Sequence, residues 1–148
     1  NGLSHVSHFL PLKNWSYKDE NGEDLYGLVT GAHRFKIGNS MAERLKAMAE
    51  TSDVSIMLEG GLGSLEEALI VHAMGGKNIY FPSLGHAPAI LNEIIRYKRV
   101  PKPPTYMSDG YEEVIKTLVP DLPVLEEQVE VPEEKCNTTL LRAMLHKL

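Results

Sequence analysis

The sequence predicts an α/β fold built on a doubly wound parallel sheet. Short apolar runs alternate with longer segments whose apolar residues recur at helical spacing, which is the order expected of repeated strand–helix units. One run, residues 54–58, is almost entirely apolar, as expected for a strand covered on both faces of a parallel sheet. A loop containing three glycines follows it and leads into a helical pattern. We therefore expect strand, loop and helix to repeat along residues 1–119.

The first elements are two candidate strands and a helix. Apolar runs at residues 5–10 and 25–30 predict the strands. Ser40 is expected to begin the helix, because Glu43 stands three residues later and completes a capping box. The helix is expected to end at residues 51–53. Its apolar face is formed by Met41, Leu45, Met48 and Ala49.

The later elements continue this alternation. A helix is expected at residues 64–74, closed by Gly75 and Gly76, since glycine readily adopts the left-handed turn that ends helices. The remaining elements are expected to be a strand at 78–81, a helix at 88–97, a short extended segment at 104–107 and a helix at 110–118.

Composition changes near residue 120 and divides the chain into three segments. Residues 1–119 form the α/β domain, residues 120–136 an acidic linker that contains prolines, and residues 137–148 an amphipathic helix. The helix either packs on its own domain or docks on another subunit. Its apolar stripe comprises Leu140, Leu141, Met144, Leu145 and Leu148.

Overall composition excludes several classes of protein. The 148 residues carry a formal charge of −5, so nothing attracts the chain as a whole to nucleic acid or an anionic membrane. The single cysteine, Cys136, excludes an internal disulfide and suits a cytoplasmic protein. No apolar run reaches the length of a membrane span. The histidines are scattered, so we expect neither a metal site nor a redox cofactor.

The glycine loop is the best candidate for a binding site. Gly60, Gly61 and Gly63 let the backbone approach a ligand closely, and the first amides of the following helix carry partial positive charge. Together with Leu62 and Ser64, these glycines are expected to hold a phosphate or another anion. The alternative is that a strand-to-helix turn simply needs glycine.

At this loop the sequence resembles the LOG family, long labelled "lysine decarboxylase". Two elements carry the resemblance: Met41-Ala42-Glu43-Arg44, and the segment from Gly60 to Glu67, at the spacing found in the family. The resemblance covers about residues 5–118. LOG proteins are nucleoside 5′-monophosphate phosphoribohydrolases that release cytokinin bases. The resemblance implies a Rossmann-like fold, with Arg44 and Glu67 in the catalytic roles.

The chain departs from the family pattern in three places. Glu59 stands where the family has proline, and its carboxylate either repels a phosphate or accepts hydrogen bonds from ribose hydroxyls. Ser64 replaces threonine and keeps the hydroxyl. The opening strands of the family fold, with a second glycine loop, have no counterpart here.

Glu67 has two possible roles. A carboxylate near the sugar would stabilise the positive charge that develops on ribose when an N-glycosidic bond breaks. Alternatively, Ser64 and Glu67 form a capping box, in which Glu67 only closes the start of a helix.

Arg44 and Met41 also have alternative roles. A guanidinium can bind phosphate or ribose oxygens through two parallel hydrogen bonds. The other reading is a solvated Arg44 paired with Glu43 or Glu50. Met41 would form a wall of the base pocket, or belong to the core.

The sequence as a whole favours an N-glycosidase that acts on a nucleoside 5′-monophosphate, such as AMP or a cytokinin ribotide. The first alternative is a non-catalytic nucleotide-binding or carrier protein on the same scaffold. The second is an interaction subunit that acts through its terminal helix.

Assembly and completeness can be anticipated as well. We expect a homo-oligomer, because one helix is apolar on more than one side through Leu65, Ala68, Leu69, Val71, Ala73 and Met74. We also expect these residues to be the C-terminal part of a longer polypeptide, or a second chain to supply the missing strands. Expressed alone, the segment is then expected to be poorly soluble or molten and not to hydrolyse AMP.

Overall fold

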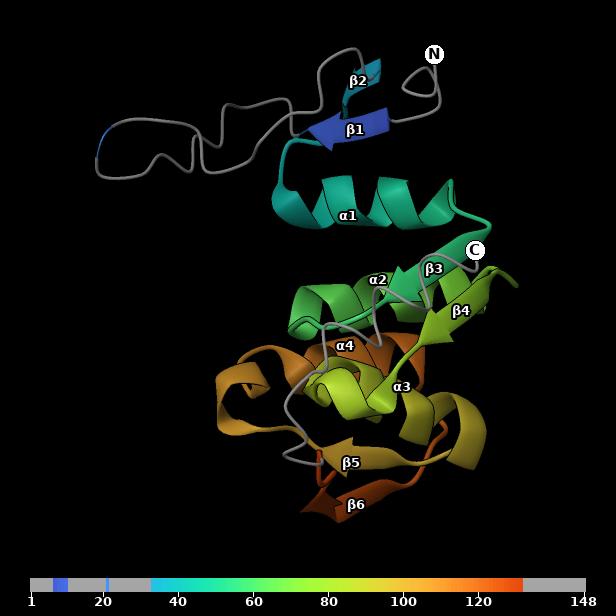
Figure 1. The fold of residues 1–148 in the computed structure, drawn as a ribbon, viewed down its shortest axis with the longest axis vertical. Helices are drawn as coiled ribbons and strands as arrows, with labels where there is room; N and C mark the ends of the chain where they lie inside the picture. The colour runs from blue at the N-terminus through green and yellow to red at the C-terminus, as the bar shows by residue number, and fades with distance from the viewer. Residues whose placement is uncertain (1–6, 11–20, 22–32, 132–148) are drawn as a thin grey trace, which may run out of the picture. The chain divides into compact units, whose positions relative to one another are not determined.

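The structure, a computed structural model, describes residues 7–10, 21 and 33–131. The chain divides into two compact units, Asn1–Thr51 and Ser52–Leu148, and each is described by itself. Helices and parallel strands make up the described residues, which confirms the predicted α/β class (Figure 1). The strands pair as three two-stranded parallel sheets.

The described residues of the first unit include two strands that pair in parallel. Strand β1 (Ser7–Leu10) pairs with β2 (His33–Lys36), with Ser7 opposite His33. The strand predicted at residues 5–10 is thus confirmed over its described part. The strand predicted at residues 25–30 lies outside the described residues, whereas β2 was not predicted.

Helix α1 (Met41–Glu50) begins and ends as its sequence predicts. The Ser40 hydroxyl accepts a hydrogen bond from the Glu43 amide at 3.1 Å, which is one half of the expected capping box. The Glu43 carboxylate accepts the other bond from the amide of Asn39, one residue before the cap, at 2.7 Å. At the far end, the Thr51 hydroxyl donates to the last-turn carbonyl of Ala47 at 3.0 Å.

A strand–helix–strand repeat opens the second unit. Strand β3 (Val54–Met57) pairs in parallel with β4 (Lys77–Tyr80), and α2 (Leu62–Ala73) connects them. The predicted glycine end of α2 is confirmed as a Schellman motif. Gly75, at φ +83°, donates to the His72 carbonyl at 3.0 Å, and Gly76 donates to the Val71 carbonyl at 2.8 Å.

The rest of the second unit departs from the prediction at four places. Helix α3 (His86–Tyr97) begins two residues before residue 88, and strand β5 (Val100–Lys102) was not predicted. The segment at 104–107, expected to be extended, contains a 3-10 turn, and the segment assigned to a linker contains a strand that pairs in parallel with β5. Residues 132–148, with the predicted terminal helix, lie outside the described residues. The bounds are η2 Pro82–Leu84, α3 His86–Tyr97, β5 Val100–Lys102, η3 Thr105–Met107, α4 Tyr111–Leu118 and β6 Val124–Gln128.

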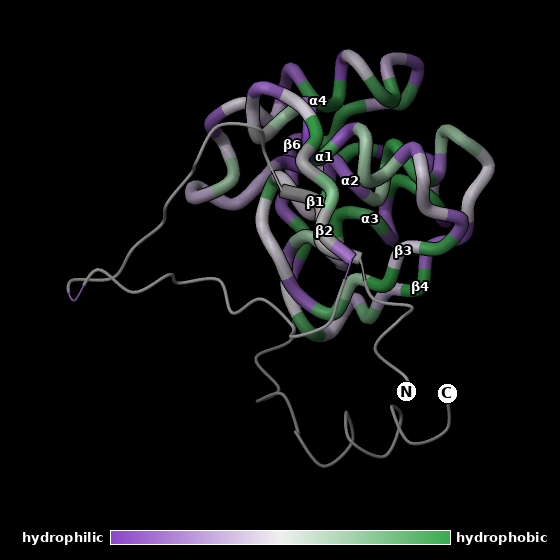
Figure 2. The backbone as a smooth tube through the Cα atoms, turned by 90° about the horizontal axis from the view of Figure 1, so that it is seen from above, coloured by the Kyte–Doolittle hydropathy of each residue, from purple (hydrophilic) through white to green (hydrophobic). Residues whose placement is uncertain are grey.

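The core of the second unit lies where α2 packs against α3 and α4. Along these helices, hydrophobic and hydrophilic segments alternate, as amphipathic helices require (Figure 2). Because the buried residues come from all three helices and from the strands, the unit holds the start of α2 in a fixed place. The largest buried side chains include Leu65, Leu69, Ile90, Leu91, Ile94, Val100 and Met107.

The expectation that residues 54–58 are covered on both faces is wrong for the described structure. Met57 is buried and faces the core, whereas Val54 and Ile56 are 46% and 55% exposed. Ile79, in register with Ile56 on β4, is 39% exposed. The helices of this unit pack on one side of the strand pair, so the other side keeps its apolar residues open.

A buried tyrosine links α4 to β5 and gives a stability prediction. The Tyr111 hydroxyl donates to the Pro101 carbonyl at 2.8 Å, and the residue is 3% exposed. Tyr111→Phe is expected to lower the free energy of unfolding by about 1 kcal/mol at pH 7, because the buried carbonyl loses its donor. Urea denaturation measures this difference.

The same residue predicts an alkaline dependence. Burial raises the pKa of the Tyr111 phenol well above its usual value near 10. The folded pKa therefore exceeds the unfolded one, so this contribution is complete below about pH 10 and is lost as the pH rises further. Tyr111→Phe should flatten the alkaline loss of stability, and an unchanged alkaline slope would contradict this role.

Candidate functional site

The glycine loop joins β3 to α2 and closes tightly on the helix. Gly60 has φ +140°, which disfavours any residue with a side chain. A Cβ at Gly60 would lie 2.4 Å from the Ser64 Oγ and 2.6 Å from its Cβ, far inside normal contact. A Cβ at Gly61 would meet nothing within 4 Å. Gly60 is therefore the glycine that sets the loop geometry and holds the backbone against Ser64.

Helix α2 begins two residues earlier than predicted, and this changes the role of Ser64. Gly61 is the N-cap, and its carbonyl accepts from the Leu65 amide at 3.1 Å. The predicted capping box of Ser64 with Glu67 is wrong, because Ser64 lies inside the helix rather than at its cap. Glycine lets the chain enter the helix without a side-chain cap, so the serine did not mark the start.

The first turn of α2 offers backbone donors to an anion. The amides of Leu62, Gly63 and Ser64 precede the first amide that bonds back into the helix, that of Leu65. Aligned peptide dipoles add a partial positive charge at this end. The predicted phosphate-binding residues therefore do lie together on one helix start.

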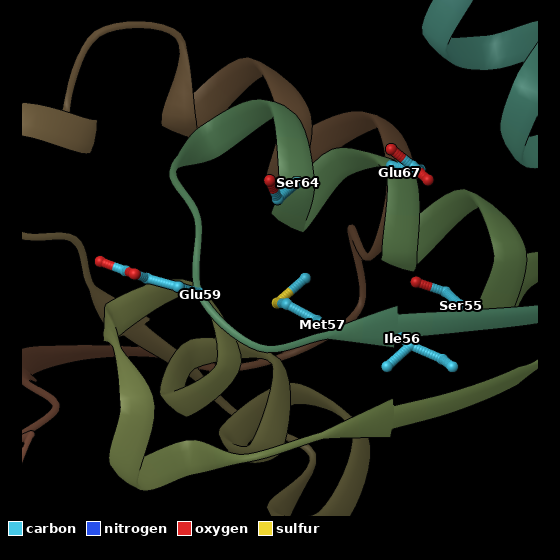
Figure 3. A pocket seen from close by; sticks show the side chains of 6 residues that line it. All are labelled: Ser55, Ile56, Met57, Glu59, Ser64 and Glu67. Atoms are coloured by element: carbon cyan, nitrogen blue, oxygen red, sulfur yellow. The ribbon is translucent and has the colours of Figure 1, made fainter. Parts of the chain in front are cut away.

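A pocket opens beside this helix start, within the second unit (Figure 3). Its volume is about 90 Å³, well below the roughly 300–1,000 Å³ of pockets that enclose whole small-molecule ligands. It can therefore take one group, such as a phosphate or an edge of a sugar, but not an entire nucleotide. The lining residues are Ser55, Ile56, Met57, Glu59, Ser64 and Glu67.

The charge of this pocket is negative. Two of the six lining residues, Glu59 and Glu67, are acidic, and none is basic. Glu67 lies three residues beyond Ser64 on α2, so the two side chains share a face of the helix about 4.5 Å apart along its axis. The pocket thus places a carboxylate one turn from the amides that would bind an anion.

Glu59 points in another direction. Its side chain extends away from Ser64 and Glu67 (Figure 3). Its Cγ would be 3.2 Å from a Cβ at Gly85, the N-cap of α3, so Glu59 lies against the start of the next helix. The departure from the family pattern therefore places little negative charge over the first turn of α2.

The other two predicted site residues, Arg44 and Met41, belong to α1 in the first unit. Arg44 is partly buried, and its amide donates to the Ser40 carbonyl at 3.1 Å. A Cβ at Gly38, which has φ +73°, would lie 2.8 Å from the backbone nitrogen of Arg44. The absence of a side chain at Gly38 therefore allows the chain before α1 to pass close to the backbone of Arg44. The expectation that Arg44 and Glu67 reach one cavity stays a prediction.

Several residues near the pocket were not predicted. The His86 and Tyr106 rings meet edge to face with centroids 5.6 Å apart. Partial burial, and then the charge of Glu59, raise the pKa of the Tyr106 phenol. Asn78, in register with Ser55, has buried amide atoms without a hydrogen-bond partner among the described residues. Because the chain places these residues in different loops and strands, no local pattern marks them.

Comparison with known proteins returns nothing: no family model, curated protein or solved structure matches the chain. Within the part of the chain that the structure describes, no helix combines the length and apolar character needed to cross a membrane.

Proposed function

We propose that the chain hydrolyses the N-glycosidic bond of a nucleoside 5′-monophosphate, giving a free base and ribose 5-phosphate. One observation carries the proposal: Ser64, in the first turn of α2, and Glu67, one turn further on, line one pocket. The amides provide a site for phosphate, and the Glu67 carboxylate lies one helical turn away, within reach of a ribose attached to that phosphate.

The proposed reaction needs few protein groups. The C1′–N bond breaks with its electron pair going to the base, while a water oxygen bonds to C1′; of the two water protons, one stays on the new C1′ hydroxyl and one reaches the base. Positive charge develops on the ribose ring as the bond lengthens. Glu67 stabilises that charge or orients the water, and Ser64 and the amides fix the phosphate. Arg44, from the first unit, adds the missing positive charge in this proposal.

The wider proposal follows the resemblance to the LOG family. The repeated parallel strand–helix–strand order supports a Rossmann-like, doubly wound sheet. We also propose that the enzyme is cytoplasmic. We also propose a homo-oligomer, or a second chain that completes the site. Four of the six apolar residues named on α2 are buried within the chain, so the exposed Ala73 and Met74, the latter at 62% exposure, are the residues that support an interface there.

A non-catalytic nucleotide-binding protein is the second candidate. The volume of about 90 Å³ favours it, because so small a pocket does not suit a closed catalytic site. Such a protein would bind the nucleotide without breaking it.

The deciding experiment measures binding and turnover separately. Titration of the native protein, isolated with whatever completes its site, with AMP and with ribose 5-phosphate, followed by NMR, is expected to shift the amides of Leu62, Gly63 and Ser64. Chromatography of AMP incubated with the native protein, isolated with whatever completes its site, is expected to show free adenine. Binding without adenine supports the second candidate, and no binding of either ligand overturns both.

A further inference from the structure

Three segments that follow successive strands bring together a second group of side chains. Glu59 follows β3, His86 begins α3 after β4 and η2, and Tyr106 lies in η3 after β5. In α/β proteins, ligands bind beyond the carboxyl ends of parallel strands, and each of these residues lies beyond such an end. Glu59 also lines the pocket beside α2, so this group borders the proposed catalytic site.

The contacts in this group are specific. Gly85 leaves the space that Glu59 occupies, since a Cβ there would lie 3.2 Å from the Glu59 Cγ. The His86 ring meets the Tyr106 ring at 76°, which is an edge-to-face contact that fixes both rings. Tyr106 is nevertheless 64% exposed. A large part of its ring is therefore held in place and open to solvent.

This arrangement suits a planar ligand that carries hydrogen-bond donors. An exposed aromatic ring provides a stacking surface for a nucleobase. A carboxylate only accepts hydrogen bonds, and the two vicinal hydroxyls of a ribose are matching donors. The pocket beside α2 is too small for a whole nucleotide, so the rest of the ligand must lie outside it.

We propose that Tyr106, held by His86, stacks on the base of the nucleotide and that Glu59 accepts hydrogen bonds from its ribose hydroxyls. This subsite rests on the proposed function, because it assumes that the phosphate occupies the start of α2. It gives Glu59 a binding role at the position where the LOG family has proline. A Cβ at Gly110, which follows η3, would lie 3.3 Å from the Cδ2 atom of Leu62. The segment after η3 therefore lies close to the residue that follows the glycine loop.

The test compares ligands that share parts of AMP. Isothermal titration of the native protein, isolated with whatever completes its site, with AMP, adenosine and ribose 5-phosphate separates the contribution of the base from that of the phosphate. We expect AMP to bind about tenfold more tightly than ribose 5-phosphate. Tyr106→Ala should remove this difference, while Tyr106→Phe, which keeps the ring, should retain it. Glu59→Gln should weaken the binding of adenosine several-fold.

Tyr97→Ala is the matched control. Tyr97 is a half-exposed tyrosine at the other end of α3, beside Arg96 and Arg99, and lies about 16 Å along the helix from His86. Tyr97→Ala should leave the affinities for AMP, adenosine and ribose 5-phosphate unchanged.

The outcomes separate this subsite from the proposed function. Equal binding of AMP and ribose 5-phosphate, or equal effects of Tyr106→Ala and Tyr97→Ala, overturns the subsite alone. Adenosine binding that Tyr106→Ala abolishes, without any binding of ribose 5-phosphate, supports the subsite and overturns the phosphate site. Failure of all three ligands to bind overturns both.

Discussion

Glu67→Gln is expected to reduce adenine release from AMP by about 10²-fold or more while changing AMP affinity less than threefold. The Glu67 carboxylate lines the pocket one turn from the start of α2. Its charge opposes the positive charge that appears on ribose only as the bond breaks, so its loss affects the transition state far more than the bound substrate. Rates at saturating AMP and equilibrium titration measure the two effects.

Glu66→Gln is the matched control for this change. Glu66 is the adjacent carboxylate on α2, is partly buried like Glu67 and does not line the pocket. It should keep full activity. Thermal unfolding, measured on both variants, separates a loss of stability from a loss of catalysis, and Gly61 rather than Glu67 is the cap of the helix. Equal losses of activity in both variants would remove Glu67 from the mechanism.

The sequence predicted the end of α2 and the start of α1 well because their signals are local. Gly75 and Gly76 end α2 as expected, and Ser40 with Glu43 begins α1. Helix starts were less exact. Pro88 was taken as the first residue of a helix, but α3 begins at His86. The first four amides of any helix lack an internal partner, so proline at the third position loses no hydrogen bond.

Two short strands of the second unit were missed for a different reason. β5 contains Pro101, and β6 carries Glu126 and Glu127, so neither shows the apolar alternation of a typical strand. Pairing in the folded chain makes them strands, and one bond of that pairing joins the Val100 amide to the Pro123 carbonyl at 2.8 Å. Tertiary contacts decide whether such segments form strands, and the pattern of residue types along the chain does not reveal those contacts.

In the candidate site, too, residues on one local segment could be predicted and residues brought together by the fold could not. Ser64 and Glu67 could be predicted because both lie on one helix after one loop. His86 and Tyr106 could not, since the fold brings them to Glu59 from separate loops. Arg44 belongs to the other unit of the chain, so its part in the site depends on family spacing alone.

Gly60→Ala is expected to lower the free energy of unfolding by about 2–4 kcal/mol and to abolish AMP binding. Two effects add in this variant. A side chain at φ +140° strains the backbone by about 1–3 kcal/mol. The new Cβ would also lie 2.4 Å from the Ser64 Oγ, so either the loop or the start of α2 must move. Urea denaturation gives the first quantity and titration with AMP the second.

Two further variants separate strain from collision at Gly60. Gly61→Ser is the control, because a side chain there meets nothing within 4 Å and serine is a good N-cap, so stability should change by less than about 0.5 kcal/mol. Adding Ser64→Gly to Gly60→Ala removes the collision but keeps the strained φ, so the two changes should be less harmful together than their separate effects predict. Additive effects would mean that Ser64 does not lie against Gly60. Unchanged stability and AMP binding in Gly60→Ala would show that the loop does not depend on glycine, and the phosphate site at the start of α2 would lose its structural basis.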